Sequence, residues 1–160
     1  MNRKEMNINM DICVYDNVLS DDFLIFIRKE ISNMSWKTHA STPDDEQFFF
    51  ACETNNYLSH QYLFDFFCNK YSFNYKKLRS YVNCYPPQSS GSFHPDDGDY
   101  TFLFYPDKTE NKKGSTLFKN GSEVTYKTNR LLVFNARLVH KADKNLSNEM
   151  RHTIAWKTLK

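Results

Sequence analysis

The 160-residue sequence contains only four glycines, five prolines and no long apolar run. A membrane-spanning helix needs roughly 18 consecutive apolar residues, so none is predicted, and no apolar stretch follows Met1–Glu5 that would indicate a signal peptide. The chain also lacks internal repeats, low-complexity tracts and linker-like segments. We therefore expect one compact, soluble domain over residues 1–160, with a supporting part (1–75) and a core (76–160).

The net charge and the number of cysteines are small as well. A net charge of +2 is too small to favour nucleic acid as a partner. The four cysteines are widely spaced in apolar surroundings, which favours buried thiols over disulfides or a zinc site. Unpaired thiols indicate a reducing compartment, so we expect a cytoplasmic monomer. The Asn- and Lys-rich composition hints at an AT-rich genome, and a viral source would place the protein in the host cytoplasm.

Aromatic residues are plentiful, at 16% of the chain, and suit a core packed with Phe and Tyr. A short strand is predicted over Asp11–Tyr15, and Ser20 is a helix N-cap followed by acidic first-turn residues. The spacing of apolar residues predicts a helix after Ser20 with one buried face. That face consists of Phe23, Ile27 and Ile31, with Phe26 alongside.

Further elements follow in the same way. A strand is expected at Phe48–Ala51 after a loop at Pro43–Glu46, and a second helix at Leu58–Tyr71. Its inward side is expected to carry Leu58, Tyr62, Phe66 and Leu63, packed against a sheet; a partner-binding face is the alternative. From Lys77 the pattern alternates as in a strand. One face holds Leu78, Ser80, Val82 and Cys84, and the other holds Arg79, Tyr81, Asn83 and Tyr85.

His94 and Asp96 form the most informative pair in the sequence. Alternate side chains of an extended segment share a face, so both can point the same way, and His140 can join them from another strand. Two imidazoles and one carboxylate can hold Fe(II) on three sites and leave the others open. This pattern predicts an oxygenase. A surface His-Pro-Asp turn is the alternative, because Pro95–Gly98 is also a good turn sequence.

Seven segments, in order and at near-family spacings, resemble the 2-oxoglutarate/Fe(II) dioxygenases and, within them, the prolyl-hydroxylase branch. They are Asn83–Pro86, Gly91–Asp96, Thr101–Tyr105, Gly114–Thr116, Asn129–Phe134, Arg137–His140 and Arg151–Trp156. The resemblance implies an α+β fold with a double-stranded β-helix (jelly-roll) core and two supporting N-terminal helices. It also implies that His94, Asp96 and His140 are the catalytic iron ligands.

Five more residues take roles from the resemblance. Arg151 would anchor the far carboxylate of 2-oxoglutarate, for which a planar guanidinium is suited; an ordinary surface arginine is the alternative. Tyr85 and Tyr105 match tyrosines that hydrogen-bond the co-substrate, although either could simply pack in the core. Arg137 matches an arginine at the substrate mouth, with solvated surface charge as the alternative. Trp156 falls one position away from the family's pocket aromatic, which puts its substrate role in doubt.

The implied activity is hydroxylation of a C–H bond with Fe(II), 2-oxoglutarate and O₂, with ascorbate as a further reductant. A prolyl hydroxylase acting on a peptide or protein is favoured, and a small-molecule hydroxylase is the alternative. A non-catalytic binding module and a nucleic-acid dealkylase are less favoured; dealkylases have a second arginine where this chain has Lys157. The resemblance implies that the Asp107–Lys113 loop lies at the active-site mouth, where it could close over substrate; a solvated hairpin connection with no role is the alternative. Strand parity predicts a pocket lined by Leu103, Leu117 and Val133.

Overall fold

The computed structural model describes residues 11–40, 48–108 and 113–160. These ranges form ten strands and two helices. In chain order they are β1 (Ile12–Asp16), α1 (Asp21–Ser32), β2 (Lys37–Ala40), β3 (Phe48–Glu53), α2 (Leu58–Tyr71), β4 (Lys76–Tyr85), β5 (Tyr100–Tyr105), β6 (Ser115–Phe118), β7 (Glu123–Thr125), β8 (Arg130–Asn135), β9 (His140–Ala142) and β10 (Arg151–Leu159). The predicted sheet-rich fold with two N-terminal helices is confirmed.

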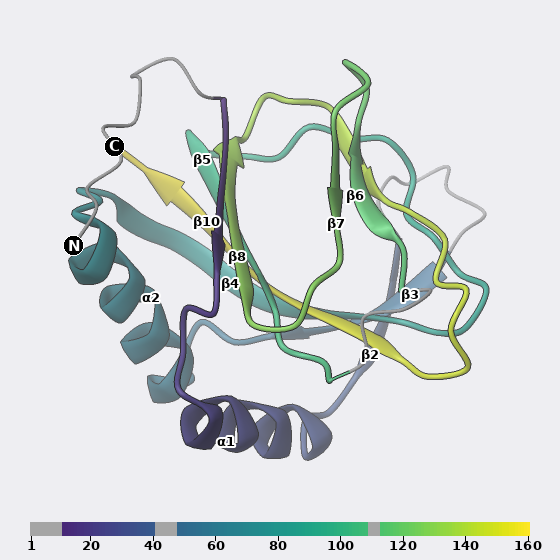
Figure 1. Cartoon of the computed structure of the whole chain (residues 1–160), viewed down its shortest axis with the longest axis horizontal. Helices are drawn as coiled ribbons and strands as arrows, with labels where there is room; N and C mark the ends of the chain where they lie inside the picture. Colours follow the sequence, from purple (N-terminus) through teal and green to yellow (C-terminus); the bar gives the residue numbers. More distant parts are fainter. Residues whose placement is uncertain (1–10, 41–47, 109–112) are drawn as a thin grey trace.

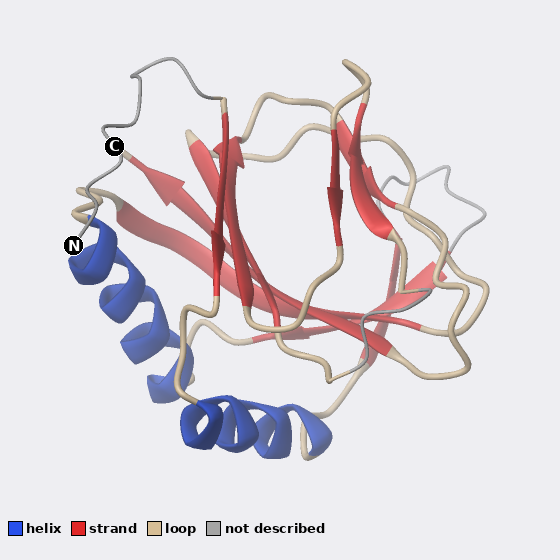
Figure 2. Ribbon diagram, in the orientation of Figure 1, coloured by secondary structure: helices blue, strands red, loops and turns tan. Residues whose placement is uncertain are grey.

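The strands form two antiparallel sheets. The larger has the order β1-β8-β5-β10-β4-β3-β2 and the smaller has the order β7-β6-β9. Figure 1 shows α1 and α2 on one side of the large sheet and β6 and β7 on the opposite side, and Figure 2 shows the same layers by element type. The N-terminal strands are part of the large sheet, since β1 pairs with β8 and β3 pairs with β4. The large sheet therefore has a helix-covered face and a face turned toward the small sheet.

Helix α1 begins where the sequence predicts. The Ser20 hydroxyl accepts a hydrogen bond from the Phe23 amide at 3.4 Å, which caps the first turn. Ile27 and Ile31 are buried as expected, but the third buried residue is Leu24. Phe23 is only partly buried, and Phe26 is 50% exposed. The predicted placement of Phe26 beside the buried face is therefore wrong.

Helix α2 has the predicted bounds but a different inward face. The residues that it buries are His60, Leu63, Phe64 and Phe67. Leu58 is 87% exposed and Tyr62 is 61% exposed, so the prediction that they point inward is wrong. Aromatic and aliphatic residues are distributed over several faces of this helix. Periodicity alone therefore does not determine which face points toward the sheet.

Strand β4 shows the predicted alternation. Ser80, Val82 and Cys84 are buried on the helix-covered face, whereas Tyr81 and Asn83 border the cavities between the sheets. On the helix side, rings from α2 pack against β5 and β10. Phe67 lies 5.7 Å from Phe104 and 5.9 Å from Trp156 between ring centroids. This core fixes the large sheet, so the opposite face is free to carry polar side chains.

All four cysteines lie in the described ranges and are free thiols, as predicted. Cys52 and Cys84 are buried, but Cys13 and Cys68 are only partly buried, so the prediction of buried thiols is wrong for these two. Within those ranges no helix is long and apolar enough to cross a membrane. The predicted loop at Pro43–Glu46 lies outside the described residues, as do positions 109–112 of the predicted Asp107–Lys113 loop.

Candidate metal centre and co-substrate pocket

Backbone hydrogen bonds bring His94 and His140 side by side although 46 positions separate them in the sequence. The His94 amide donates to the His140 carbonyl at 2.9 Å, and the His140 amide donates back at 3.0 Å. Two residues later the Asp96 amide donates to the Ala136 carbonyl at 2.8 Å. The segment after β4 is thereby held against the start of β9, with the three side chains converging at one end of the large sheet.

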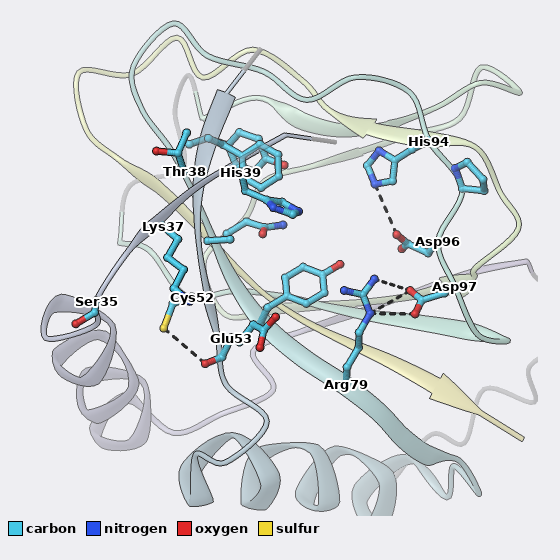
Figure 3. Close-up of a pocket in the computed structure, with 16 residues that line it drawn as sticks. Ser35, Lys37, Thr38, His39, Cys52, Glu53, Arg79, His94, Asp96 and Asp97 are labelled. Atoms are coloured by element: carbon cyan, nitrogen blue, oxygen red, sulfur yellow. Dashed lines mark hydrogen bonds and ion pairs between the residues drawn. The ribbon is translucent and has the colours of Figure 1, made fainter. Parts of the chain in front are cut away.

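The ligand atoms of His94, Asp96 and His140 all lie within 4.8 Å of one another. His94 Nε2 is 3.6 Å from Asp96 Oδ1, and His140 Nε2 is 3.4 Å from Asp96 Oδ2. Figure 3 shows His94 and Asp96 facing each other at one wall of the cleft. This donor set, two imidazole nitrogens and one carboxylate, has the chemistry of a facial Fe(II) site.

Each histidine is oriented by a backbone carbonyl. His94 Nδ1 lies 2.8 Å from the Ser92 carbonyl oxygen, and His140 Nδ1 lies 2.8 Å from that of Leu138. A carbonyl accepts only, so each Nδ1 carries a proton and each Nε2 is directed toward the centre. The rings are thus oriented as a metal requires.

The three groups have perturbed pKa values. Burial lowers the pKa of His140 to about 4. Burial also opposes the charged form of His94, but its contacts with Asp96 and the Ser92 carbonyl raise its pKa above the usual value. For Asp96, burial is outweighed by Lys157 and the histidines, which hold its pKa well below the usual range. Asp96 is therefore a carboxylate, and His140 is neutral, as ligands must be.

Arg151, the first residue of β10, is fully buried. Its Nη1 donates to the Asp143 carbonyl and its Nη2 to the Ser115 carbonyl, each at 3.0 Å. Its Nε is buried and has no hydrogen-bond partner in the part of the chain that the structure describes, and the same holds for Asn83 Oδ1 on the neighbouring strand β4. An unpaired buried donor is costly. The position of this donor beside the inner cavity therefore fits a ligand carboxylate.

The two tyrosines predicted to hydrogen-bond the co-substrate differ in their position relative to the inner cavity. Tyr85 pairs with Arg151 across the β4–β10 ladder, borders the inner cavity and stacks on Phe49 at 4.7 Å. Tyr105 is fully buried, and its hydroxyl lies 2.7 Å from Thr116 Oγ1. Thr116 borders the inner cavity and Tyr105 does not. Tyr105 can therefore act on a ligand there only through Thr116.

Trp156 and Arg137 lie away from the cavity. Trp156 is fully buried on the helix side of the large sheet, and its indole Nε1 donates to the His60 carbonyl at 3.1 Å. The prediction that Trp156 contacts substrate is therefore wrong, because side chains of successive strand residues point to opposite faces. Arg137 is exposed in the turn before β9, three residues from His140.

Two cavities meet this centre. The outer cleft has a volume of about 690 Å³ and is bordered by β2, β3, β4 and the His94–Asp97 segment. In Figure 3, Lys37, Thr38 and His39 lie across the cleft from His94, and Arg79 holds Asp97 through a two-pronged ion pair. The inner cavity, about 40 Å³, extends between the histidines and Arg151. Of the predicted lining residues only Leu103 borders it; Phe134 and Thr116 take the places expected for Val133 and Leu117.

Lys157 is the site residue that sequence reasoning missed. It is 2% exposed, and its ammonium group makes an ion pair with Asp96 Oδ2. The Thr101 hydroxyl donates to the same oxygen at 2.6 Å. Alternation along β10 from Arg151 places residues 153, 155 and 157 on the cavity face, so the signal was present in the sequence.

No protein-family model matches the sequence, and no curated protein matches it. Solved structures do match its fold. A prolyl hydroxylase from Trichoplax adhaerens, in complex with a hypoxia inducible factor peptide, is 17% identical, with a TM-score of 0.71 over 91% of this chain and 82% of that one. A viral collagen prolyl hydroxylase from Paramecium Bursaria Chlorella virus-1 is 15% identical, with a TM-score of 0.65 over 95% and 98%.

A third similar structure is HygX from Streptomyces hygroscopicus, determined with nickel and 2-oxoglutarate bound. It is 11% identical, with a TM-score of 0.73 over 91% of this chain and 81% of that one. The TM-scores show a common fold, whereas identities this low leave the substrate open. The chain thus has the fold of the 2-oxoglutarate/Fe(II) oxygenases of known structure, prolyl hydroxylases among them.

Proposed function

We propose that this protein is an Fe(II)- and 2-oxoglutarate-dependent oxygenase that hydroxylates a C–H bond. The observation that carries the proposal is the convergence of His94, Asp96 and His140, with ligand atoms within 4.8 Å, at one end of a cavity that has Arg151 beside it. When bound, iron and 2-oxoglutarate would activate O₂, so that 2-oxoglutarate becomes succinate and CO₂ while a substrate C–H becomes C–OH. The two sheets would then be the halves of a double-stranded β-helix in a single domain of residues 1–160.

Each residue has a defined task under this proposal. His94 and His140 would bind the metal through Nε2, with Nδ1 held by carbonyl oxygens. Arg151 would bind the far carboxylate of the co-substrate through its unpaired Nε, in a buried site where a charge-assisted bond is strong. Tyr85 borders the same cavity and would orient the co-substrate, while Tyr105 would act through the Thr116 hydroxyl.

The inner cavity must enlarge to admit the co-substrate. One water requires roughly 10–15 Å³, so a volume of about 40 Å³ holds a few waters and is too small for a five-carbon dicarboxylate. Leu103 is an apolar side chain that borders it. Co-substrate binding therefore requires bordering side chains such as Leu103 to move.

For the substrate, we favour proline in a peptide or protein. Strand β2 is the last strand of the large sheet and lies beside the outer cleft. Among the described residues no further strand pairs with its outer edge, so an extended chain could add there. A small molecule is the second candidate, because a cleft of about 690 Å³ also has the size of a small-molecule site. Arg137, exposed in the turn before β9, would contact the part of the substrate that extends beyond the cleft in either case. We further propose that the protein is a cytoplasmic monomer and that it uses ascorbate as a reductant.

Succinate release tests the function. Protein loaded with Fe(II) under anaerobic conditions is given 2-oxoglutarate and O₂ with proline-containing peptides, free proline or a lysate, and the product is identified from a mass increase of one oxygen. We expect substrate-stimulated succinate release, absent from Asp96→Ala. Stimulation by peptides alone would support the peptide hydroxylase, and stimulation by free proline alone would favour the small-molecule enzyme. Succinate release that is equal in Asp96→Ala would contradict the proposed metal site.

A further inference from the structure

A lysine contacts the carboxylate of the proposed metal centre. Lys157 is 2% exposed, and its ammonium nitrogen is paired with Asp96 Oδ2. The same nitrogen lies 3.2 Å from Thr101 Oγ1 and 5.4 Å from the centroid of the Tyr81 ring. Lysines are almost never fully buried unless they are paired. Asp96 is therefore the charge that keeps this ammonium group inside the protein.

Strand pairing fixes Lys157 in this place. Lys157 is opposite Thr101 on β5 and opposite Arg79 on β4. Arg79 is itself engaged by Asp97, with Nη2 2.6 Å from Oδ1, so it does not compete for Asp96. Among the described residues, Lys157 is the lysine or arginine that forms an ion pair with Asp96; the other two charged-pair contacts are the histidines, and the Thr101 hydroxyl donates a hydrogen bond.

We propose that Lys157 is an internal counter-ion for Asp96 that competes with the metal. This inference rests on the proposed metal centre. Without metal, the ammonium group balances the buried carboxylate. With metal, one carboxylate lies between a dication and a lysine cation, and the repulsion between these cations weakens metal binding. Lys157 thereby lowers metal affinity and keeps the metal-free site folded.

The two carboxylate oxygens of Asp96 have different contacts. Oδ2 receives both Lys157 and the Thr101 hydroxyl and has His140 Nε2 3.4 Å away, whereas Oδ1 has only His94 Nε2, 3.6 Å away, among the described contacts of Asp96. The donors on Oδ2 hold the carboxylate in one orientation and leave Oδ1 as the oxygen for a metal. Removing Lys157 should therefore have two opposite effects: the empty site loses its charge balance, and the metal loses its competitor.

Four variants separate charge from positioning. Lys157→Met removes the charge, Lys157→Gln removes the charge but keeps a donor, and Lys157→Arg keeps the charge. Thr101→Val is the matched control, because it removes the other donor to Asp96 Oδ2 at 2.6 Å without changing any charge. A residue that only positions Asp96 would behave like Thr101, and its loss would weaken metal binding.

The experiment is a titration of metal-free protein with Mn(II), followed by calorimetry, with thermal unfolding measured in the absence and presence of Mn(II). We expect Lys157→Met and Lys157→Gln to bind Mn(II) about tenfold more tightly than wild type. Both should unfold at lower temperature without metal and show a larger rise with Mn(II). Lys157→Arg should resemble wild type, and Thr101→Val should not bind more tightly.

The outcomes are distinct. If wild type binds Mn(II) and both charge-removing variants bind it equally or more weakly, the counter-ion inference is overturned while the metal centre stands. If wild type does not bind Mn(II), the metal centre itself fails, and the inference fails with it. Should Lys157→Met not fold without metal, Lys157→Gln supplies the same comparison, because its amide can still donate to Asp96.

Discussion

Substitution of Arg151 by methionine should remove co-substrate binding while metal binding remains. The guanidinium group of Arg151 is fully buried, and its Nε has no partner of its own. Breaking a buried, charge-assisted contact costs roughly 2–4 kcal/mol. This corresponds to a loss of 2-oxoglutarate affinity of roughly 30- to 1,000-fold. Among the described residues, none of the Arg151 hydrogen bonds involves a predicted metal ligand, so Mn(II) affinity should stay within experimental error.

The assay is a titration of Mn(II)-loaded protein with 2-oxoglutarate in the absence of O₂. Arg151→Lys keeps the charge but loses the planar fork, so it should fall between wild type and Arg151→Met. Lys29→Met is the matched control, because Lys29 is exposed on α1 and its loss changes the net charge by the same amount. Its 2-oxoglutarate affinity should equal that of wild type.

Stability must be measured alongside. Arg151 also donates to the Asp143 and Ser115 carbonyls, and hydrogen bonds to charged groups contribute about 1.5–3 kcal/mol each. Arg151→Met should therefore unfold at lower temperature, and titrations belong well below that transition. Unchanged 2-oxoglutarate affinity in a folded, Mn(II)-binding variant would refute Arg151 as the anchor. Equal loss of both ligands would indicate disruption of the fold instead.

Three further predictions concern the same site and the core. His94→Ala and Asp96→Ala should abolish binding of about one Mn(II) per chain; full stoichiometry in either, measured by calorimetry, would exclude the triad. Tyr105→Phe should weaken 2-oxoglutarate by about 1 kcal/mol or less, because its hydroxyl acts through Thr116; a larger loss in the same titration would place Tyr105 in direct contact. Burial lowers the pKa of His60 to about 4, and the unfolded chain, with its usual value near 6.5, binds the proton first. Through His60 alone, wild type should therefore lose up to roughly 3 kcal/mol of stability as pH falls from about 6.5 to 4. His140, whose pKa burial also lowers to about 4, contributes equally to wild type and to a His60 variant. His60→Leu should show a shallower loss in denaturant unfolding, and parallel curves would contradict the assignment.

The sequence was sufficient for the parts of the fold that local chemistry determines. Ser20 caps α1 where predicted, and α2 has the predicted bounds of Leu58–Tyr71. Alternation along β4 correctly separated Val82 from Asn83. The convergence of the triad was predictable only through the resemblance, because His140 reaches His94 by hydrogen bonds between distant segments. Such pairing depends on the register of strands that local patterns do not encode.

Rotation of α2 could not be read from the sequence. Aromatic residues occupy both its buried face, with Phe64 and Phe67, and its exposed one, with Tyr62. Burial of His60 further obscures the pattern, because a histidine counts as polar in any periodicity argument. The deciding factor is tertiary: Phe64 lies 5.4 Å from Phe102 of β5, and Phe67 lies 5.9 Å from Trp156 of β10. The sheet, absent from a local pattern, selects the helix face.

The alternation of side chains along β10 explains why the prediction for Trp156 was wrong. The resemblance placed Trp156 one position from the family's pocket aromatic, whereas counting by twos from Arg151 selects Lys157. The physical reason is that each face of β10 suits one of these two side chains. An indole fills the apolar space under α2 and finds the His60 carbonyl, while an ammonium group opposite Thr101 finds Asp96. Exchanging the two would bury a charge among rings and leave Asp96 without its ion-pair partner, so one position of register determines both the core and the electrostatics of the proposed metal centre.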